Sequence, residues 1–345
     1  KQEWAQCVSP ELKPYDANID LFERGTTMDM ITPVFERLKQ ELIPLIHAIQ
    51  AHSYQPDTAF LQGRFALDKQ EALGGDMQMT CENGINQDIG FNFEQGRMDV
   101  SVHPFCGGSH PTDVRITTRY KDSNFVESLY AVIHETGHAL YEQGRPHELG
   151  DLPAAESLTM GIHESQSLFW ERMIAQSKPF CQHYFETIRA VFPDNLKSAT
   201  VDSFYRAINT CKPDFIRVEA DEVTYPLHII LRYEIEKGLF DGSMQVDDLP
   251  HIWNELMQKY LGIQPPTDAL GVLQDSHWSG GAFGYFPSYT LGAMYACQFY
   301  QTLLREQPDT EQNIAKGNFA PIKNWLNEKI HRQGRLYSPQ ELVQR

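Results

Sequence analysis

The residues with the clearest chemical potential are His134, Glu135 and His138, which form the pattern H-E-x-x-H. On a helix, residues i and i+4 lie on the same face, so both imidazoles can reach one metal ion. The glutamate can then act as a general base on a water molecule that the metal acidifies. The alternative is a helix with two structural histidines. The apolar residues around the pattern predict a buried helix, and we favour the metal site.

A catalytic site of this kind needs a third protein ligand. The downstream candidates are His147, Glu156 and the pair His163 and Glu164. A helix predicted from Pro153 to Gln176 places Glu156 in its first turn and Glu164 about two turns further on. If this helix folds back on the motif helix, its middle lies beside the motif, so we expect Glu164 to be the ligand. His163 is either a hydrogen-bonding group near the metal or a core residue.

Helical spacing of apolar residues predicts most of the remaining structure. It predicts a helix from Met28 to Ala51 and a motif helix that begins after Asn124, with Glu127 as its capping-box partner. Between residues 88 and 120 the pattern alternates as in strands. We therefore expect a mainly α fold with a small β-sheet near residues 88–120.

Two glycine signals, at Gly96 and at Gly107-Gly108, predict turns within this sheet. The strand that includes residues 113–120 could also pair with an extended substrate, as the edges of sheets do. No Gly/Ser-rich linker divides the chain, so residues 1–345 are expected to form a single catalytic domain.

Composition excludes several classes of partner. The chain has 345 residues, with 29 basic against 46 acidic side chains and a net charge of −17. This acidity argues against nucleic acid, whose phosphates need basic surfaces. The chain has no apolar run that approaches the roughly 20 residues needed to span a membrane. The six cysteines form no C-x-x-C pair and are expected to be buried, free thiols of a cytoplasmic protein.

Six motifs in order give the chain a strong resemblance to the carboxypeptidase Taq family of metallocarboxypeptidases, from about Tyr15 to Leu342. They are His103-Pro104-Phe105, Asp113-x-Arg115-x-Thr117, His134 to His138, His163-Glu164-Ser165-Gln166, Ile216-Arg217-x-x-Ala220-Asp221 and Gly271-x-x-Gln274-Asp275-x-His277-Trp278.

The resemblance implies that His134, His138 and Glu164 hold one divalent metal per chain, commonly zinc, with cobalt or manganese as substitutes. It assigns Glu135 as the general base. It implies the helical, saddle-like fold with a deep groove that angiotensin-converting enzyme and neurolysin-type peptidases share. Similar proteins are cytoplasmic homodimers that release C-terminal amino acids from peptides with broad specificity. Compared with them, this chain is expected to lack N-terminal helices and the extreme C-terminus.

A carboxypeptidase must also stabilise an oxyanion and hold a free carboxylate. For the oxyanion we expect Tyr289 or Tyr285, with His277 close by, although each tyrosine could simply pack in the structure. For the carboxylate, the planar fork of an arginine is suited. We rank Arg217 slightly ahead of Arg115, although Arg217 could equally be an ion-paired residue of a helix.

Asp113 and Arg115 would lie on one face of a strand, where they could pair with each other as structure. His103 could shape the substrate pocket or serve in a turn. Two other functions stay open: an endo-acting oligopeptidase of the neurolysin type, and an inactive, metal-stabilised binding paralogue. The intact Glu135 favours an enzyme.

Overall fold

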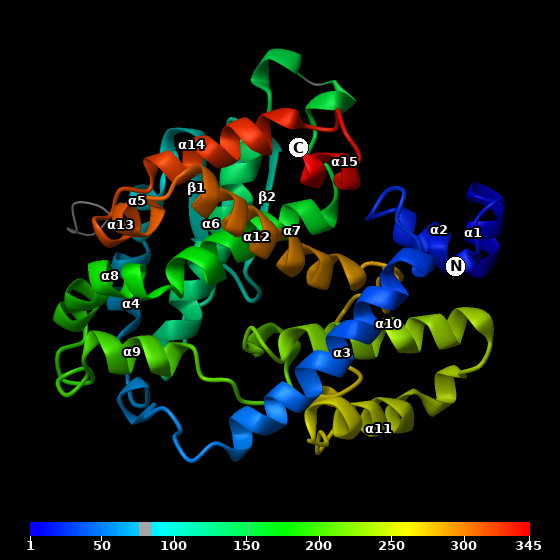
Figure 1. Cartoon of the computed structure of the whole chain (residues 1–345), viewed down its shortest axis with the longest axis horizontal. Helices are drawn as coiled ribbons and strands as arrows, with labels where there is room; N and C mark the ends of the chain where they lie inside the picture. Colours follow the sequence, from blue (N-terminus) through cyan, green and yellow to red (C-terminus); the bar gives the residue numbers. More distant parts are fainter. Residues whose placement is uncertain (76–83, 151) are drawn as a thin grey trace. The chain divides into compact units, whose positions relative to one another are not determined.

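The computed structural model describes residues 1–75, 84–150 and 152–345, which are mainly helical as predicted (Figure 1). The chain divides into two compact units. Unit 1 comprises residues 1–55, 159–161 and 210–291, and unit 2 comprises residues 56–158, 162–209 and 292–345. That the chain forms a single catalytic domain stays a prediction. Among the described helices, none is long and apolar enough to cross a membrane.

Unit 1 is helical and packs around an apolar core that includes Tyr15, Phe35 and Trp253. Helix α3 spans Met28–Ala51 as predicted. Helix α10 is buried along most of its length, so Arg232 and Glu236 on it are charged groups inside the core. The helices of unit 1 are α1 (Gln2–Val8), α2 (Pro14–Asp20), α3, η6 (Arg217–Glu219), α10 (Tyr225–Asp241), η7 (Val246–Asp248), α11 (Leu249–Leu261) and η8 (Asp268–Leu270).

Unit 2 holds a larger core, which includes Tyr141, Phe169 and Trp170, together with the sheet and the motif helix α6. Two helices, α7 (Met160–Leu168) and α12 (Pro287–Glu306), contribute residues to both units. The other elements of unit 2 are η1 (Ala59–Leu61), α4 (Leu67–Gly74), α5 (Ile85–Ile89), η2 (Phe93–Gln95), β1 (Gly96–Val100), β2 (Phe105–His110), β3 (Asp113–Thr118), α6 (Phe125–Gly144), η3 (His147–Leu149), η4 (Pro153–Ala155), η5 (Phe169–Ala175), α8 (Lys178–Val191), α9 (Val201–Ile208), α13 (Thr310–Ala315), α14 (Ala320–Lys329), η9 (His331–Gln333) and α15 (Pro339–Gln344).

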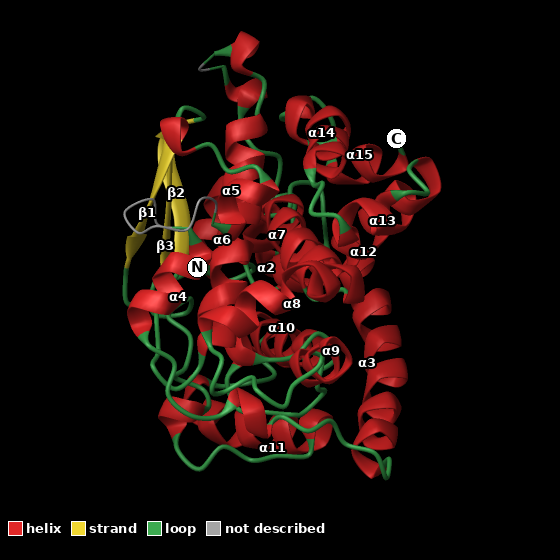
Figure 2. Ribbon diagram, turned by 90° about the vertical axis from the view of Figure 1, so that its left-hand side faces the viewer, coloured by secondary structure: helices red, strands yellow, loops and turns green. Residues whose placement is uncertain are grey.

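The predicted sheet has three strands in the order β1-β3-β2, with β1 parallel and β2 antiparallel to β3 (Figure 2). Because β3 is bonded on both sides, the predicted pairing of residues 113–120 with a substrate is wrong, and the outer edges belong to β1 and β2. Gly107 and Gly108 lie within β2 rather than in a turn, which falls at residues 111–112. Buried Val114 and Ile116 pack with Ala139 of α6.

Helix α6 begins where the sequence predicts. The side chain of Asn124 accepts hydrogen bonds from the backbone amides of Val126 and Glu127, which satisfies two donors at the helix start. The Glu127 carboxylate forms ion pairs with Arg119 and Lys121. The buried face of α6 carries Val132, Ile133 and Leu140, so the helix is fixed by packing along its length.

The helix that follows is shorter than predicted. Helix α7 begins at Met160 rather than at Pro153, because residues 153–155 form a separate 3-10 turn. Glu156 therefore lies outside the helix, where it pairs with Arg335. The chain continues beyond α7 as the π-helix η5, which ends at Ala175.

Gly137 allows the backbone of α7 to lie against α6. A Cβ atom at this position would stand 2.6 Å from the Gln166 carbonyl oxygen and 2.6 Å from the Ser167 Cα. Real side chains essentially never make such contacts, so only glycine fits. The predicted meeting of the two helices at the motif is thereby confirmed.

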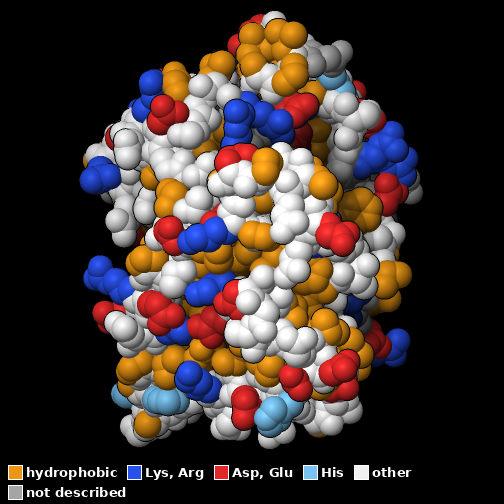
Figure 3. Space-filling view, turned by 90° about the vertical axis from the view of Figure 1, so that its right-hand side faces the viewer, with side chains coloured by type: hydrophobic (Ala, Val, Ile, Leu, Met, Phe, Trp, Pro, Cys, Tyr) orange, Lys and Arg blue, Asp and Glu red, His pale blue; other side chains and the backbone are white. Residues whose placement is uncertain are grey.

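Two further predictions concern the surface charge and the burial of the cysteines. On the face drawn in Figure 3, Lys and Arg side chains are interspersed with Asp and Glu, so positive charge is scattered there rather than gathered. The described cysteines are free thiols, but Cys7 and Cys297 are exposed and only Cys181 is buried. The predicted burial was wrong for the exposed pair. Cys81 lies outside the described residues.

Candidate metal centre

Three side chains of unit 2 converge as a possible ligand set. His134 and His138 on α6 and Glu164 on α7 each offer one ligand atom, and these atoms all lie within 4.8 Å of one another. The Nε2 atoms of His134 and His138 lie 3.7 Å and 3.4 Å from Oε2 of Glu164. His147, the nearer candidate in the sequence, is exposed and its Nε2 bonds the Gln143 carbonyl. Glu164 is therefore the third ligand that the geometry favours.

The charge balance of this site suits a cation. The carboxylates of Glu135, Glu164 and Glu171 surround two imidazoles in a buried setting. Although burial opposes its charged form, the carboxylates of Glu164 and Glu171 raise the pKa of His134 to about 9. Burial lowers the pKa of His138 to about 4. Nitrogen and carboxylate ligands in this number match the donor set of a catalytic zinc site, so the residues fit a divalent metal.

Each histidine of the set has its second nitrogen held by a partner. Nδ1 of His134 lies 2.7 Å from Oε2 of Glu171, and Nδ1 of His138 lies 2.6 Å from Nδ1 of His163. Such partners fix the ring orientation and leave the other nitrogen for the metal. His163 was among the residues expected near the metal, whereas Glu171 was not. Its position seven residues after Glu164, two helical turns further along, is the signal that could have identified it.

Glu135 lies beside the ligand set without belonging to it. Glu135 is buried, with 7% of its surface exposed. Burial raises the pKa of Glu135 to about 7, a rise that nearby His134 opposes and the carboxylates of Glu164 and Glu171 support. A carboxyl group with a pKa near neutrality can both accept and return a proton at physiological pH.

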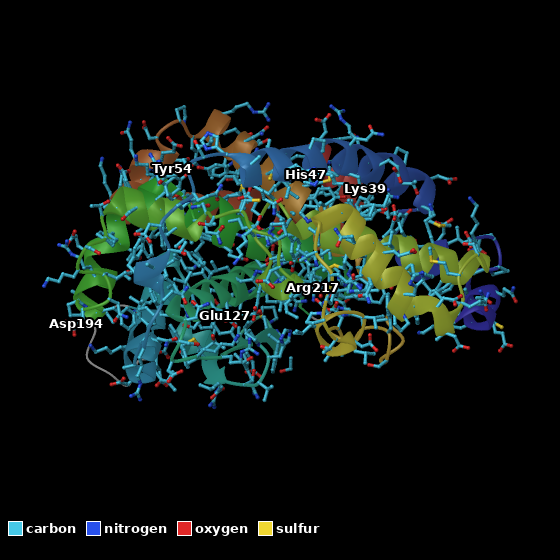
Figure 4. The ribbon with its side chains drawn as sticks, turned by 90° about the horizontal axis from the view of Figure 1, so that it is seen from below. Lys39, His47, Tyr54, Glu127, Asp194 and Arg217 are labelled. Carbon is cyan, nitrogen blue, oxygen red and sulfur yellow. The ribbon has the colours of Figure 1, made fainter. Side chains whose placement is uncertain are left out.

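In unit 1, Arg217 belongs to a buried charge cluster. Its Nε and Nη2 atoms donate to Oδ1 of Asp275 at 3.1 Å and 2.9 Å, and Arg232 Nε donates to Oδ2 at 2.7 Å. Figure 4 labels Arg217 among the interior side chains. The carboxylate that Arg217 contacts is thus that of Asp275, in the motif G-x-x-Q-D-x-H-W. Two guanidinium groups share one carboxylate, so these three side chains carry one surplus positive charge.

The predicted oxyanion residues lie in the same unit and contact one another. Nε2 of His277 is 3.0 Å from the hydroxyl of Tyr289, and the Tyr285 and Tyr289 rings are 5.3 Å apart. The Arg217 guanidinium stacks over the Tyr289 ring at 4.5 Å. The structure therefore brings Arg217 together with His277, Tyr285 and Tyr289, the residues predicted for the oxyanion.

The remaining candidates lie on or beside the sheet of unit 2. Arg115 donates to both oxygens of Asp113 at 2.9 Å and 3.0 Å, which is the structural pairing that the strand spacing allowed. Arg115 is exposed on the face of β3 opposite to Val114 and Ile116. His103 is exposed in the loop before β2. The geometry favours a structural role for the Asp113–Arg115 pair.

The buried histidine His331, which contacts α7, lets us predict how the free energy of unfolding depends on pH. Nε2 of His331 bonds Oε1 of Gln166 on α7 at 2.9 Å, and burial lowers the pKa of His331 to about 3. In the unfolded chain His331 takes up a proton near pH 6.5, whereas in the folded chain it stays neutral until about pH 3. The free energy of unfolding therefore falls as the pH drops below 6.5.

We expect this histidine to contribute a loss of about 2 kcal/mol between pH 7 and pH 5. Urea unfolding of the unmodified protein and of His331→Gln at both pH values measures it. The variant should show a smaller loss on acidification, by about that amount. Equal losses in the two proteins would show that His331 is not held neutral.

Comparison with known proteins places this site in context. The profile of the carboxypeptidase Taq (M32) metallopeptidase family matches residues 1–345. The chain is 46% identical over 330 residues to carboxypeptidase 1 of Bacillus subtilis, covering 96% of this chain and 64% of that protein. It is 40% identical over 331 residues to thermostable carboxypeptidase 1 of Thermus thermophilus, covering 96% and 63%. The chain thus spans slightly less than two thirds of the length of these relatives.

Solved structures of the same family resemble this chain in fold. The structure of Pyrococcus furiosus carboxypeptidase matches with a TM-score of 0.93 at 38% identity, over 99% of this chain and 68% of that chain. PZ peptidase A matches with a TM-score of 0.56 at 11% identity, over 99% and 62%, which is a likeness of fold alone. The predicted resemblance and the mainly α fold class are confirmed: the chain belongs to the carboxypeptidase Taq (M32) family of metallopeptidases.

Proposed function

We propose that the protein is a metal-dependent carboxypeptidase that releases C-terminal amino acids from peptides with broad specificity. The observation that carries this proposal is the convergence of His134, His138 and Glu164 within 4.8 Å, beside the buried carboxyl of Glu135. Relatives at 46% and 40% identity are named carboxypeptidases, which supports it. Zinc is the proposed metal, with cobalt or manganese as substitutes, since nitrogen and carboxylate ligands suit all three.

Glu135 is the proposed general base of the reaction. A divalent metal on the three ligands would polarise the scissile carbonyl and acidify a water molecule. Glu135 takes the proton of the attacking water and returns it to the leaving amine. Its pKa of about 7 suits both transfers at neutral pH. Glu171 and His163 keep the ligand imidazoles oriented meanwhile.

The buried charge cluster of unit 1 supports Arg217 as the group that binds the substrate carboxylate. Asp275 neutralises only one of the two guanidinium groups that it contacts. Burial lowers the pKa of Arg232 to about 10, and Arg217 adds to this effect. An anion would relieve this surplus charge, because an uncompensated buried charge is costly. Arg217 keeps its place ahead of Arg115, because Asp113 balances the charge of Arg115 one for one, whereas Asp275 is shared between Arg217 and Arg232.

Tyr289 is the proposed donor to the oxyanion, with Tyr285 and His277 beside it. The hydrogen bond to His277 orients the Tyr289 hydroxyl, and the Arg217 cation over its ring favours a partial negative charge on the phenol oxygen. A preorganised donor of this kind is worth about 10²- to 10³-fold in turnover. The proposal further includes a cytoplasmic location and a homodimeric assembly, which rest on the family resemblance.

A pair of peptides tests the function. One carries a free C-terminus and the other is identical but amidated, and mass spectrometry follows their products with and without a chelator. We expect single residues to be released from the free peptide only, and the chelator to stop the release. Internal cleavage of both peptides at similar rates would instead identify an endo-acting oligopeptidase. Metal binding without cleavage of either peptide would identify a binding paralogue.

A further inference from the structure

A continuous chain of polar contacts runs from the metal-site histidine His138 into the body of unit 2. Nδ1 of His138 lies 2.6 Å from Nδ1 of His163, and Nε2 of His163 lies 2.8 Å from Oε1 of Glu142. The other oxygen of Glu142 lies 3.1 Å from Nε of Arg145. Both ring nitrogens of His163 are thus engaged by polar groups.

The order of these contacts favours one arrangement of the protons. The ion pair with Arg145 favours the ionised form of Glu142, and an ionised carboxylate only accepts hydrogen bonds. Nε2 of His163 must therefore donate to Glu142. In neutral His163, Nδ1 then carries a lone pair and accepts the proton of His138 Nδ1. This leaves the Nε2 lone pair of His138 facing Glu164, 3.4 Å away, which is the tautomer a metal ligand needs.

We propose that His163, held by Glu142, is a positioning residue that fixes the tautomer and ring orientation of His138 for metal binding. The other ligand histidine has a different arrangement, because His134 is held directly by the Glu171 carboxylate at 2.7 Å. The two imidazoles are therefore supported by another imidazole and by a carboxylate, respectively. Outer partners of this kind are typically worth about 10- to 100-fold in metal affinity.

A cavity of about 180 Å³ lies against this pair and is lined by Glu142 and His163 together with Cys106, His110 and Val114. Its volume exceeds the roughly 10–15 Å³ needed to hold one water molecule. Water could therefore enter the space left by a small substitution such as alanine and take over the hydrogen bond to His138. The informative substitutions are those that keep the space filled.

The test compares two replacements of His163. His163→Leu fills the site and removes the acceptor. His163→Asn restores it, because Oδ1 of asparagine is as many bonds from Cα as Nδ1 of histidine. Glu142→Gln removes the charge that favours a donor at Nε2 of His163, because the glutamine amide can donate there instead. Glu156→Gln, which also removes an acidic group paired with an arginine, is the matched control.

The measurement is zinc affinity of the metal-free whole protein, by competition with a chromophoric chelator, and the absorption spectrum of the cobalt form. The melting temperature of each metal-free variant is recorded beside them. We expect His163→Leu to lose about 10- to 100-fold in zinc affinity and to alter the cobalt spectrum. His163→Asn and Glu156→Gln should stay within a few-fold of the unmodified protein.

The inference rests on the proposed function only through the metal site. Unaltered zinc affinity in His163→Leu would overturn it, as would an equal loss in His163→Leu and His163→Asn when both metal-free forms melt alike. If His163→Leu does not fold, near-normal affinity in His163→Asn together with a loss in Glu142→Gln supports the inference, and any other pattern overturns it. Failure of the unmodified protein to bind zinc would contradict the proposed function instead.

Discussion

Glu135→Gln should lose turnover by about 10²- to 10⁴-fold while it keeps its metal. Glutamine has nearly the same shape as glutamate, so the ligands His134 and His138 on the same helix stay in place. It cannot accept the proton of the attacking water, so the reaction loses its base and its acid together. Residue release from a free peptide measures the loss, and metal analysis of the same sample measures occupancy.

Glu127→Gln is the matched control, because Glu127 lies on the same helix and its carboxylate pairs with Arg119 and Lys121 away from the ligands. Its turnover should stay close to that of the unmodified protein. Activity of Glu135→Gln within a few-fold of this control, at equal metal content, would remove Glu135 from the mechanism.

Glu164→Ala should weaken metal binding by more than the 10- to 100-fold that the loss of an outer partner typically costs, since it removes a direct ligand. It also removes a negative charge from the site, the same charge that raises the pKa of His134, so the site attracts a cation less strongly. Activity at limiting metal should fall with the affinity. A titration of the metal-free variant with zinc, followed by chelator competition, measures the change.

The matched control for this residue is Glu156→Gln, which replaces another acidic candidate of the same segment. Glu156 pairs with Arg335 rather than with the histidines, so its zinc affinity should be unchanged. Should Glu164→Ala bind zinc as tightly as this control, the third ligand would have to be sought elsewhere.

The sequence predicted those parts of the fold that local signals determine. The cap at Asn124 and the apolar spacing of α6 gave the motif helix its correct start, and α3 has its predicted bounds. The predicted start of the next helix, at Pro153, was wrong, because a proline can open a 3-10 turn as easily as an α-helix. That β3 occupies the centre of the sheet depends on the pairing of strands, which no local pattern specifies.

In the candidate site, too, local patterns predicted some residues and tertiary folding determined the others. His134 and His138 follow from helical spacing, and Gly137 marks the close contact that brings Glu164 to them. The partners Glu171 and Glu142 were missed, because an isolated glutamate on a helix is usually a solvated surface residue. The pairing of Arg217 with Asp275, 58 positions along the chain, depends on tertiary folding that a single sequence does not display.

The most direct test of the central claim is a titration of the metal-free whole protein with zinc, in which bound metal and residue release from a free peptide are followed together. Because His134, His138 and Glu164 form one ligand set, activity should be absent without metal and rise in proportion to bound zinc up to one ion per chain. Full activity of the metal-free protein, or zinc binding that leaves the rate unchanged, would contradict a catalytic metal at these three residues.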